Sequence, residues 1–580
     1  MKAFLEKFLH KTGNWGIPFL IALGSFAFGV SEKGWDHTFI NGDGKGYYAH
    51  LPAVFIYRDL KFGFIEDYEK KHYQPGQLCD FRQPVDGGVV NRYYAGTALA
   101  QMPFFLITHF SCKLTGMQAD GYSRPYQYTI LFAGCFYLFM GLWALMAFLD
   151  NFFDRRRNAF IIICITLGTN LLFYTVYNPD FSHIYSFAFI SLFVKYTHQY
   201  LQRPSRKLIV ILAIILAIIA LIRPVNLIIG GVIPFLASSW KELTYRIGYA
   251  LKNYGTMFVA AITFFSIASI QLIIYYIQTG HFLVYSYGDA GLNFLKPNFI
   301  NFLFSYRKGM FIYTPLLFIS LGGVYFLLKK SFYHFITLFL FITLVIYTLS
   351  SWNVWTYGMT YGQRPVIEYY FVFTILLGYL LTPVKNKLIS VMTLSLVALT
   401  IPHNLMQISQ HRHYILHWDE MTREKYWKVF FRTDPIYYGY LWTPIHPILD
   451  DSTGYNGILL NEIPEITLGK NQSAPALTFR TSSVSSMQII LSVRLFPEID
   501  KLKKNKLHVM VRRKRESETD GFDFDITMRN VESLKWSEVR KKITLKKKDQ
   551  DEEFVITIIN NGKYPMRIRN IKVLQKHDDE

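Results

Sequence analysis

An acidic residue stands in a glycine-rich string near the N-terminus, Asn41-Gly42-Asp43-Gly44-Lys45-Gly46-Tyr47-Tyr48. A carboxylate in a flexible turn can act as a base that takes the proton of a hydroxyl nucleophile. The other interpretation of Asp43 is a turn residue whose side chain bonds nearby backbone. A calcium loop is not indicated, because no ladder of Asp, Asn and Glu ligands follows. Lys45 and Tyr48 in the same string are candidate substrate-binding residues.

Cationic residues stand near the ends of apolar stretches elsewhere in the chain, and they are Arg92, Arg223, Arg307, Lys308 and Arg364. Cations stabilise a departing phosphate, and the guanidinium fork of arginine binds phosphate in a bidentate manner. With a base, such a set suits the transfer of a phosphate-activated sugar to a hydroxyl. The alternative for each cation is snorkelling to lipid headgroups or pairing with a neighbour. Arg223 interrupts an apolar hairpin just before Pro224, so it is expected to bind either a ligand or a structural partner.

Two further charged or titratable residues lie where apolar stretches meet. His183, in Pro179-Asp180-Phe181-Ser182-His183, is a candidate for orienting a phosphate or for acid–base work, and the alternative is a histidine that bonds a helix end. Glu368 follows Arg364 by four residues, so we expect an internal ion pair between them. Aromatic residues of the same region, which either stack on sugar rings or form a membrane-interface belt, are Trp352, Trp355 and Tyr357.

The composition is that of a membrane protein with a soluble appendage. Of the 580 residues, 51% are hydrophobic and 17% are aromatic, and several apolar stretches reach the roughly 20 residues that cross a bilayer as a helix. The formal net charge of +20 gathers in clusters between these stretches, such as residues 155 to 157, as the positive-inside rule describes. No nucleic-acid recognition motif accompanies the charge. Walker, dinucleotide and zinc motifs are not indicated either.

The basic clusters orient the chain. Lysines before the first stretch place the N-terminus in the cytoplasm, and the later clusters fall on the same side if residues 97 to 110 form a re-entrant or interfacial helix. The alternative is that this segment crosses and another weak one does not. The predicted fold is a polytopic α-helical membrane protein of about 11 to 12 transmembrane helices. The expected spans are 15 to 32, 127 to 150, 159 to 177, 184 to 200, 207 to 222, 225 to 238, 255 to 278, 311 to 328, 332 to 350, 368 to 383 and 387 to 405.

Besides the tight hairpin at Arg223, this orientation exposes four segments on the outer face, and most of the other candidate residues lie in them: 33 to 126, 178 to 183, 279 to 310 and 351 to 367. After the last span comes an aromatic-rich connector, 411 to 450. From 451 to 580 the pattern changes to short runs with period two, which predicts an antiparallel β-sandwich on the outer side. The clearest runs are 477 to 480, 488 to 493, 507 to 511, 524 to 528, 554 to 559 and 568 to 574.

Three strings carry a resemblance over residues 1 to 410: Gly42-Asp43-Gly44-Lys45-Gly46-Tyr47-Tyr48, Phe304-Ser305-Tyr306-Arg307-Lys308-Gly309 and Gly362-Gln363-Arg364-Pro365. With them the chain resembles the GT-C-type integral membrane glycosyltransferases, the superfamily of protein mannosyltransferases and lipid A aminoarabinose transferases, and in particular its Bacteroidetes-like bacterial members. The resemblance implies that Asp43 is the catalytic carboxylate and that donors are polyprenyl-phosphate sugars. Many relatives carry a second acidic residue directly after the first, where this chain has Gly44. That leaves open whether Glu66, Asp67 or Asp86 supplies it, and whether a divalent cation takes part.

The sequence therefore predicts a glycosyltransferase of the bacterial inner membrane. It would move a sugar from a polyprenyl-phosphate donor to a glycan, lipid or protein acceptor on the periplasmic face, with membrane lipids but no nucleic acid as partners. Asp43 would be the base, and the candidate substrate or phosphate ligands are Lys45, Tyr48, Arg92, His183, Arg223, Arg307, Lys308 and Arg364. Two other functions stay open: a transporter or flippase of a lipid-linked glycan, and an envelope scaffold protein. Against transport, the chain shows no paired internal repeats.

Overall fold

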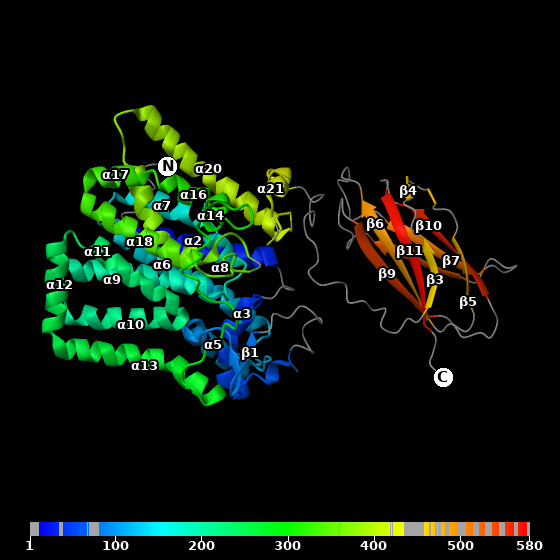
Figure 1. Ribbon diagram of the computed structural model, residues 1–580, viewed down its shortest axis with the longest axis horizontal. Helices are drawn as coiled ribbons and strands as arrows, with labels where there is room; N and C mark the ends of the chain where they lie inside the picture. The colour runs from blue at the N-terminus through cyan, green and yellow to red at the C-terminus, as the bar shows by residue number, and fades with distance from the viewer. Residues whose placement is uncertain are drawn as a thin grey trace. The chain divides into compact units, whose positions relative to one another are not determined.

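The computed structural model of the protein (Figure 1) describes residues 11–33, 39–66, 68, 81–358, 360–413, 415–417, 419 and 421–433, and, beyond residue 456, the strands with a few residues between them. The chain divides into two compact units, residues 1–408 and 409–580. The first unit is almost entirely helical and the second is mostly strand. Asp67 and residues 434 to 456 of the expected connector and the domain after it lie outside the described residues.

Long helices form the body of the first unit. Its elements are α2 (Gly16–Lys33), α3 (Asp43–Pro52), η1 (Ala53–Tyr57), β1 (Arg82–Val85), β2 (Gly88–Asn91), α5 (Gly96–Thr115), α6 (Arg124–Leu149), α7 (Arg155–Leu167), α8 (Leu171–Val176), α9 (Ser182–Gln202), α10 (Arg206–Ile222), η2 (Pro224–Val232), α11 (Ile233–Leu236), α12 (Trp240–Lys252), α13 (Tyr254–Thr279), α14 (Phe299–Phe304), α15 (Met310–Tyr313), α16 (Pro315–Ser320), α17 (Gly323–Lys330), α18 (Phe332–Ser350), η3 (Arg364–Tyr369), α19 (Tyr370–Leu380) and α20 (Lys387–Arg412).

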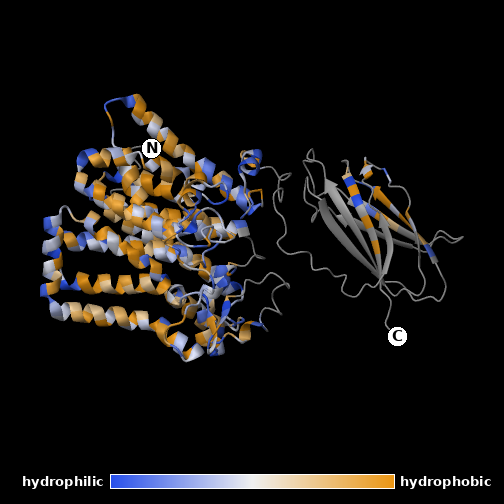
Figure 2. Cartoon of the chain, viewed as in Figure 1, coloured by the Kyte–Doolittle hydropathy of each residue, from blue (hydrophilic) through white to orange (hydrophobic). Residues whose placement is uncertain are grey.

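Four of the described helices are long and apolar enough to cross a membrane, by length and composition: α6, α13, α18 and α20. At 1.5 Å per residue the 26 residues of α13 extend about 39 Å, more than the hydrocarbon thickness of a bilayer. Its outward side chains include Phe258 and Phe265, both 67% exposed, and Figure 2 shows the apolar colouring that runs along the helix. An apolar surface of this kind suits lipid rather than water.

Four expected spans are not single helices, and their sequences give the reason. The expected span 159 to 177 divides into α7 and α8, and 311 to 328 divides into α15, α16 and α17. Pro315 begins α16 because proline has no N–H to donate to the preceding turn. The span 225 to 238 is the 3₁₀ helix η2 followed by the short α11, and 368 to 383 begins inside the 3₁₀ helix η3. The number of membrane crossings stays a prediction.

The expected outer segments are not plain loops. The first of them contains α3, η1, the antiparallel β1–β2 hairpin and α5, so residues 97 to 110 lie within a 20-residue helix. In Figure 1 these elements gather at one end of the long helices, and α12 runs across the other end. Several of the candidate residues, among them Asp43 and Arg92, lie at the end that contains α3.

The second unit contains a short helix, α21 (Arg423–Val429), and two antiparallel sheets. One sheet has the order β5-β10-β7-β8, and the other has the order β3-β11-β6-β9 with β4 beside β11. Side chains alternate between buried and less buried along β10 and β11, as the period-two pattern requires. The strands are β3 (Gly457–Glu462), β4 (Ile466–Leu468), β5 (Leu477–Thr481), β6 (Ser486–Leu495), β7 (Lys506–Arg513), β8 (Gly521–Thr527), β9 (Trp536–Thr544), β10 (Glu552–Asn560) and β11 (Met566–Lys576).

Candidate active site

A cavity of about 590 Å³, here called the polar cavity, opens at the α3 end of the helical unit. Five of the candidate residues line it, and they are Asp43, Arg92, His183, Arg223 and Arg364. They come from five separate segments between residues 43 and 364. The fold therefore brings together charged groups that the sequence spreads over more than 300 positions. The rest of the wall is largely aromatic and includes Tyr47, Tyr287, Trp352 and Tyr357.

Asp43 begins helix α3, and two glycines make its position possible. Gly42 has φ +52° and ψ −135°, a backbone conformation that only glycine adopts without strain. A Cβ atom on Gly44 would lie 1.7 Å from Oδ2 of Asp180, so no larger residue fits there without displacing that carboxylate. The Asp43 carboxylate also lies at the positive end of the helix dipole.

Asp180 fixes the chain just before Asp43. Its Oδ2 accepts a hydrogen bond from the backbone N–H of Asn41 (2.7 Å). On the other side, Oε1 of Gln127 accepts from the N–H groups of Phe39 and Ile40 at 2.8 and 2.9 Å. The sequence analysis quoted Asp180 only as part of the string around His183 and gave it no role. No local signal identifies it, because its partner lies 139 positions away.

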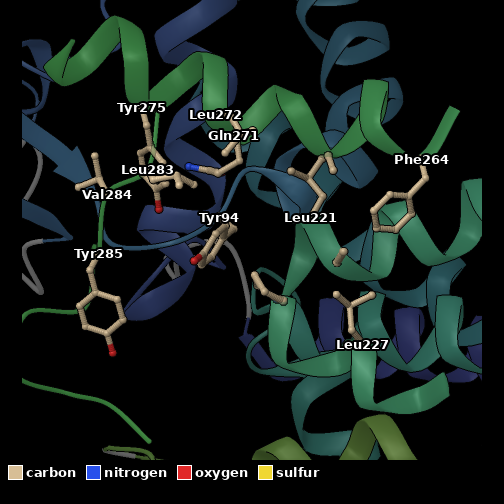
Figure 3. Close-up of a pocket in the computed structure, with 13 residues that line it drawn as sticks. Tyr94, Leu221, Leu227, Phe264, Gln271, Leu272, Tyr275, Leu283, Val284 and Tyr285 are labelled. Atoms are coloured by element: carbon tan, nitrogen blue, oxygen red, sulfur yellow. The ribbon is translucent and has the colours of Figure 1, made fainter. Parts of the chain in front are cut away.

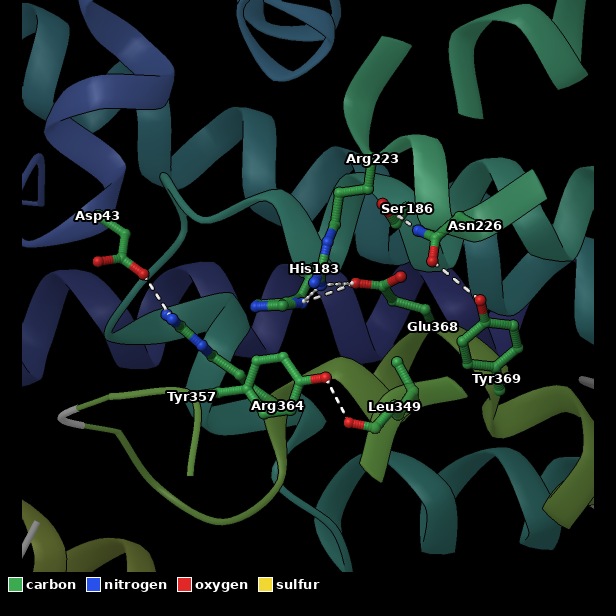
Figure 4. A network of polar contacts seen from close by, with 10 residues as sticks. All are labelled: Asp43, His183, Ser186, Arg223, Asn226, Leu349, Tyr357, Arg364, Glu368 and Tyr369. Carbon is green, nitrogen blue, oxygen red and sulfur yellow. Dashed lines mark hydrogen bonds and ion pairs between the residues drawn. The ribbon is translucent and has the colours of Figure 1, made fainter. Parts of the chain in front are cut away.

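Asp43 forms an ion pair with Arg364, with 2.6 Å between Oδ2 and Nη2 (Figure 4). Arg364 also lies over the ring of Phe181, 5.2 Å from its centroid. Burial alone would raise the pKa of the Asp43 carboxyl, but the adjacent Arg364 guanidinium and a hydrogen bond from Tyr93 outweigh burial, so the pKa lies below its usual value of 3.8. Asp43 is therefore an ionised carboxylate at neutral pH, which a base must be.

The expected ion pair between Arg364 and Glu368 is wrong. Glu368 instead bonds Arg223, with 2.6 Å from Nη1 to Oε1, and His183, with 2.8 Å from Nδ1 to Oε1. The cause is the local backbone: residues 364–369 form a 3₁₀ helix. With three residues per turn, positions i and i+4 do not share a face, as they would in an α-helix.

Glu368 belongs to a buried polar network. Its side chain is 0% exposed and that of Arg223 is 16% exposed. Behind this pair, Tyr369 donates to Oδ1 of Asn226 (2.9 Å), and Asn226 donates to Oγ of Ser186 (3.3 Å). Arg223 was expected to bind either a ligand or a structural partner, and the structure shows a structural partner, Glu368. The guanidinium also lines the cavity, so it can contact a ligand as well.

The loop after α13 and the loop after α18 are joined along one side of the polar cavity. Leu292 and Trp352 form an isolated antiparallel bridge, and Asn353 bonds the backbone of Gly291 and Asp289 through its side chain. Beyond the bridge, Tyr357 has φ +54°. Such a backbone conformation is unusual for a bulky residue, and residues that adopt it are often found at functional sites. The Tyr357 hydroxyl donates to the carbonyl of Leu349 (2.8 Å), which holds its ring at the cavity wall.

Four candidate residues do not line the polar cavity. Tyr48 lies in the apolar core beneath α3, and its hydroxyl donates to the carbonyl of Gly121. Lys45 is buried within α3. Lys308 donates to the backbone carbonyl of Thr360, so it fastens the loop before Arg364, and Arg307 is exposed. Their roles as ligands stay predictions.

The carboxylates left open as a second acidic group are placed apart from the cavity. Glu66 forms an exposed ion pair with Arg82 at 3.3 Å, and Asp86 is exposed in the β1–β2 turn. Among the residues that the structure describes, no group of three or more His, Cys, Asp or Glu side chains could hold a metal ion. Participation of a divalent cation stays an open prediction.

An apolar pocket of about 430 Å³ meets the polar cavity. Tyr94, Pro224 and Tyr285 line both spaces. Figure 3 shows tyrosines, among them Tyr94 and Tyr285, at one end of this apolar pocket and Leu221, Leu227 and Phe264 at the other. Its remaining lining residues are Ala220, Ala268, Gln271, Leu272, Tyr275, Leu283 and Val284. The polar cavity and the apolar pocket together are thus charged at one end and apolar at the other.

No protein-family model matches the chain, and no curated protein matches it. Among solved structures, it is similar to the archaeal oligosaccharyltransferase AglB from Archaeoglobus fulgidus in complex with an inhibitory peptide and a dolichol-phosphate, with 11% identity and a TM-score of 0.40 over 74% of this chain. The apo form of the Archaeoglobus fulgidus oligosaccharyltransferase gives 11% identity and a TM-score of 0.37 over 72% of this chain. The chain covers 60% of the length of each. Similarity at this level assigns no function by itself.

Replacing Glu368 with glutamine tests the buried pair. The Glu368→Gln variant leaves Arg223 as an uncompensated buried charge, which should cost about 3 to 5 kcal/mol of unfolding free energy. The matched control is Glu66→Gln, which removes the exposed pair with Arg82 and should cost about 1 kcal/mol or less. Denaturant unfolding of the purified protein in detergent measures both values. Equal losses in the two variants would show that the Arg223–Glu368 pair does not hold the site together.

Proposed function

We propose that the chain is a glycosyltransferase that moves a sugar from a polyprenyl-phosphate-linked donor to a glycan, lipid or protein acceptor at the periplasmic face of a bacterial inner membrane. One observation carries the proposal: an ionised carboxylate and three guanidinium groups share one cavity, and that cavity meets an apolar pocket. A lipid-linked sugar phosphate has the matching parts. Its phosphate suits the guanidinium groups, and its isoprenoid chain suits the apolar pocket.

The reaction assigns a step to each charged group. The acceptor hydroxyl attacks the anomeric carbon of the donor sugar, the bond from that carbon to the phosphate oxygen breaks, and Asp43 takes the hydroxyl proton. Direct displacement inverts the configuration at the anomeric carbon. The leaving polyprenyl phosphate changes from a phosphodiester with one negative charge to a monoester with two. Arg223 and Arg364 line the cavity and stabilise this added charge.

The charge of the network favours a donor with a single phosphate. Arg92, Arg223 and Arg364 line the cavity, and the paired carboxylates are those of Asp43 and Glu368. Counted over these five groups alone, three guanidinium charges against two carboxylate charges leave one positive charge. A phosphodiester with one negative charge neutralises that excess, whereas a diphosphate would add a further uncompensated charge in a partly buried site.

Arg364 links donor binding to the base. In the structure its Nη2 bonds Asp43, and its Nε is buried without a hydrogen-bond partner among the described residues. A phosphate that binds the Arg364 guanidinium from the polar cavity would draw its charge away from Asp43. The carboxylate would then become a stronger base as the donor enters.

Loss of the carboxylate should abolish transfer. The Asp43→Asn variant cannot accept the hydroxyl proton, so we expect transfer from a panel of polyprenyl-phosphate sugars in reconstituted vesicles to fall by about 100-fold or more. The control is Asp289→Asn, which removes an exposed carboxylate from a loop next to the same cavity and should keep the wild-type rate. Equal activity of Asp43→Asn and wild type would remove Asp43 as the base. Lipid movement across the bilayer without transfer would support a flippase instead.

Loss of Arg364 should move the acid limb of the pH–rate profile. Because the pKa of Asp43 lies below 3.8 in the intact site, its carboxylate stays ionised until the pH falls below that value. In Arg364→Gln, burial acts without the opposing guanidinium, so the pKa rises and activity is lost at a higher pH. The profile of kcat/KM against pH measures this shift, with Arg82→Gln as the control. An acid limb that does not move in Arg364→Gln would contradict the pairing.

Filling the apolar pocket should discriminate between donor chains. In Ala268→Trp the indole occupies part of the pocket, so KM should rise for long-chain polyprenyl donors and change little for donors with a single isoprene unit. The same substitution at Ala261, an exposed position of α13 outside the pocket, is the control. An equal rise in KM for long and short donors would show that the pocket does not hold the lipid chain.

A further inference from the structure

Helix α12 lies at the end of the helical unit opposite the polar cavity. In Figure 1 it runs across the ends of α10 and α13, whereas those two helices run toward the end that contains α3 and α5. Only Asn253 separates it from α13, which begins at Tyr254. Since α13 is long and apolar enough to cross a membrane, α12 must lie at the level where α13 leaves the hydrocarbon.

Hydrogen bonds fix α12 in this position. Ser239 caps its first turn by accepting from the N–H of Glu242. Tyr200 at the end of α9 donates to the carbonyl of Arg246 (2.9 Å), and Arg206 at the start of α10 donates to Oδ1 of Asn253 (2.9 Å). The helix therefore belongs to the rigid framework of the unit.

The helix presents a stripe of large apolar side chains outward. Trp240, Ile247 and Leu251 are 57%, 48% and 64% exposed, and they lie within about 40° of one another around the helix axis. Leu243 faces the protein and is 6% exposed. On a surface in water such a stripe is unfavourable, whereas at the edge of a bilayer it enters the acyl region.

A cationic stripe lies beside the apolar one. Lys241 and Lys252 are exposed and are about 100° to 120° from Trp240 around the axis. The helix contains one acidic residue, Glu242, which pairs with Arg246 at 3.6 Å. Arg203, just after α9, and Lys207, in the first turn of α10, are exposed at the same end. The outward charge of this face is therefore positive, and it matches an anionic surface.

We propose that α12 is an interfacial helix that binds the anionic phospholipid headgroups of the membrane leaflet opposite the polar cavity. The Trp240, Ile247 and Leu251 stripe enters the acyl boundary. Lys241 and Lys252 contact the phosphate and glycerol groups above it. Together they set the depth at which α13, and through it the far end of the helical unit, sits in the bilayer.

A fluorescent probe at Leu251 tests both parts of this arrangement. Bimane is attached to Leu251→Cys in a Cys79→Ser background, where Cys112, Cys135 and Cys164 are buried. The full chain is reconstituted in phosphatidylcholine vesicles that contain equal mole fractions of either brominated phosphatidylglycerol or brominated phosphatidylcholine. Both lipids should quench the probe, and phosphatidylglycerol should quench it more strongly, with a local enrichment of about fivefold or more, because each lysine near an anionic surface contributes about 1 kcal/mol.

Paired charge variants separate headgroup binding from simple burial. In Lys241→Gln/Lys252→Gln the preference for phosphatidylglycerol should disappear while quenching by phosphatidylcholine remains. The control Lys61→Gln/Lys113→Gln removes two exposed lysines outside α12 and should keep the preference. Absence of quenching by either lipid would place the stripe outside the bilayer and overturn the proposal, leaving a protein partner as its occupant. Equal quenching by both lipids in the unsubstituted helix would overturn the anionic preference.

Discussion

Buried charge must be paired, and this constraint organises the end of the helical unit that contains α3. Two guanidinium groups lie where apolar helices end, and each has a carboxylate brought from a distant part of the chain. Arg364 pairs with Asp43, more than 300 positions earlier, and Arg223 pairs with Glu368, 145 positions later. An unpaired charge at either site would cost several kcal/mol. The two pairs therefore fix the relative positions of α3, the end of α10 and η3, and the cavity is the space that they enclose.

The turn before α9 serves both pairs at once. Asp180 holds the backbone that leads to Asp43, and the ring of Phe181 lies under the Arg364 guanidinium. Nδ1 of His183 lies 2.8 Å from Oε1 of Glu368 and 3.1 Å from Nη1 of Arg223. Four consecutive residues thus connect the base to both cations. A small shift of this turn would change the Asp43–Arg364 pair and the Arg223–Glu368 pair together. The positions of the two ion pairs are therefore coupled through the protein itself.

The sequence predicts which residues lie at the polar cavity better than it predicts which of them form ion pairs with one another. Position at the ends of apolar stretches selected His183, Arg223 and Arg364, because charge in such places is costly, whereas Asp43 was selected from its glycine-rich string and from the family resemblance. The same reasoning also selected Arg307 and Lys308, which do not line the polar cavity. The pairing was not predictable, since the i,i+4 rule that joins Arg364 to Glu368 assumes an α-helix and the chain is 3₁₀ there. Asp180 was missed because its effect is on the backbone of Asn41, a contact with no local pattern. Hydropathy found the apolar stretches and the break before Pro224, but it did not show that Pro315 would divide the stretch from 311 to 328.

The joined spaces also restrict the kind of ligand that the site accepts. Tyr94, Pro224 and Tyr285 belong to both walls, so a molecule that fills both must change from anionic to aliphatic at that boundary. A water-soluble nucleotide sugar would satisfy the guanidinium groups but leave the apolar pocket empty. A neutral lipid would fill the pocket but leave one positive charge without a counter-ion. An amphiphile with one phosphate at the junction, the donor of the proposed function, would meet both requirements, and the walls of Tyr287, Trp352 and Tyr357 would offer aromatic faces to the apolar faces of its sugar ring.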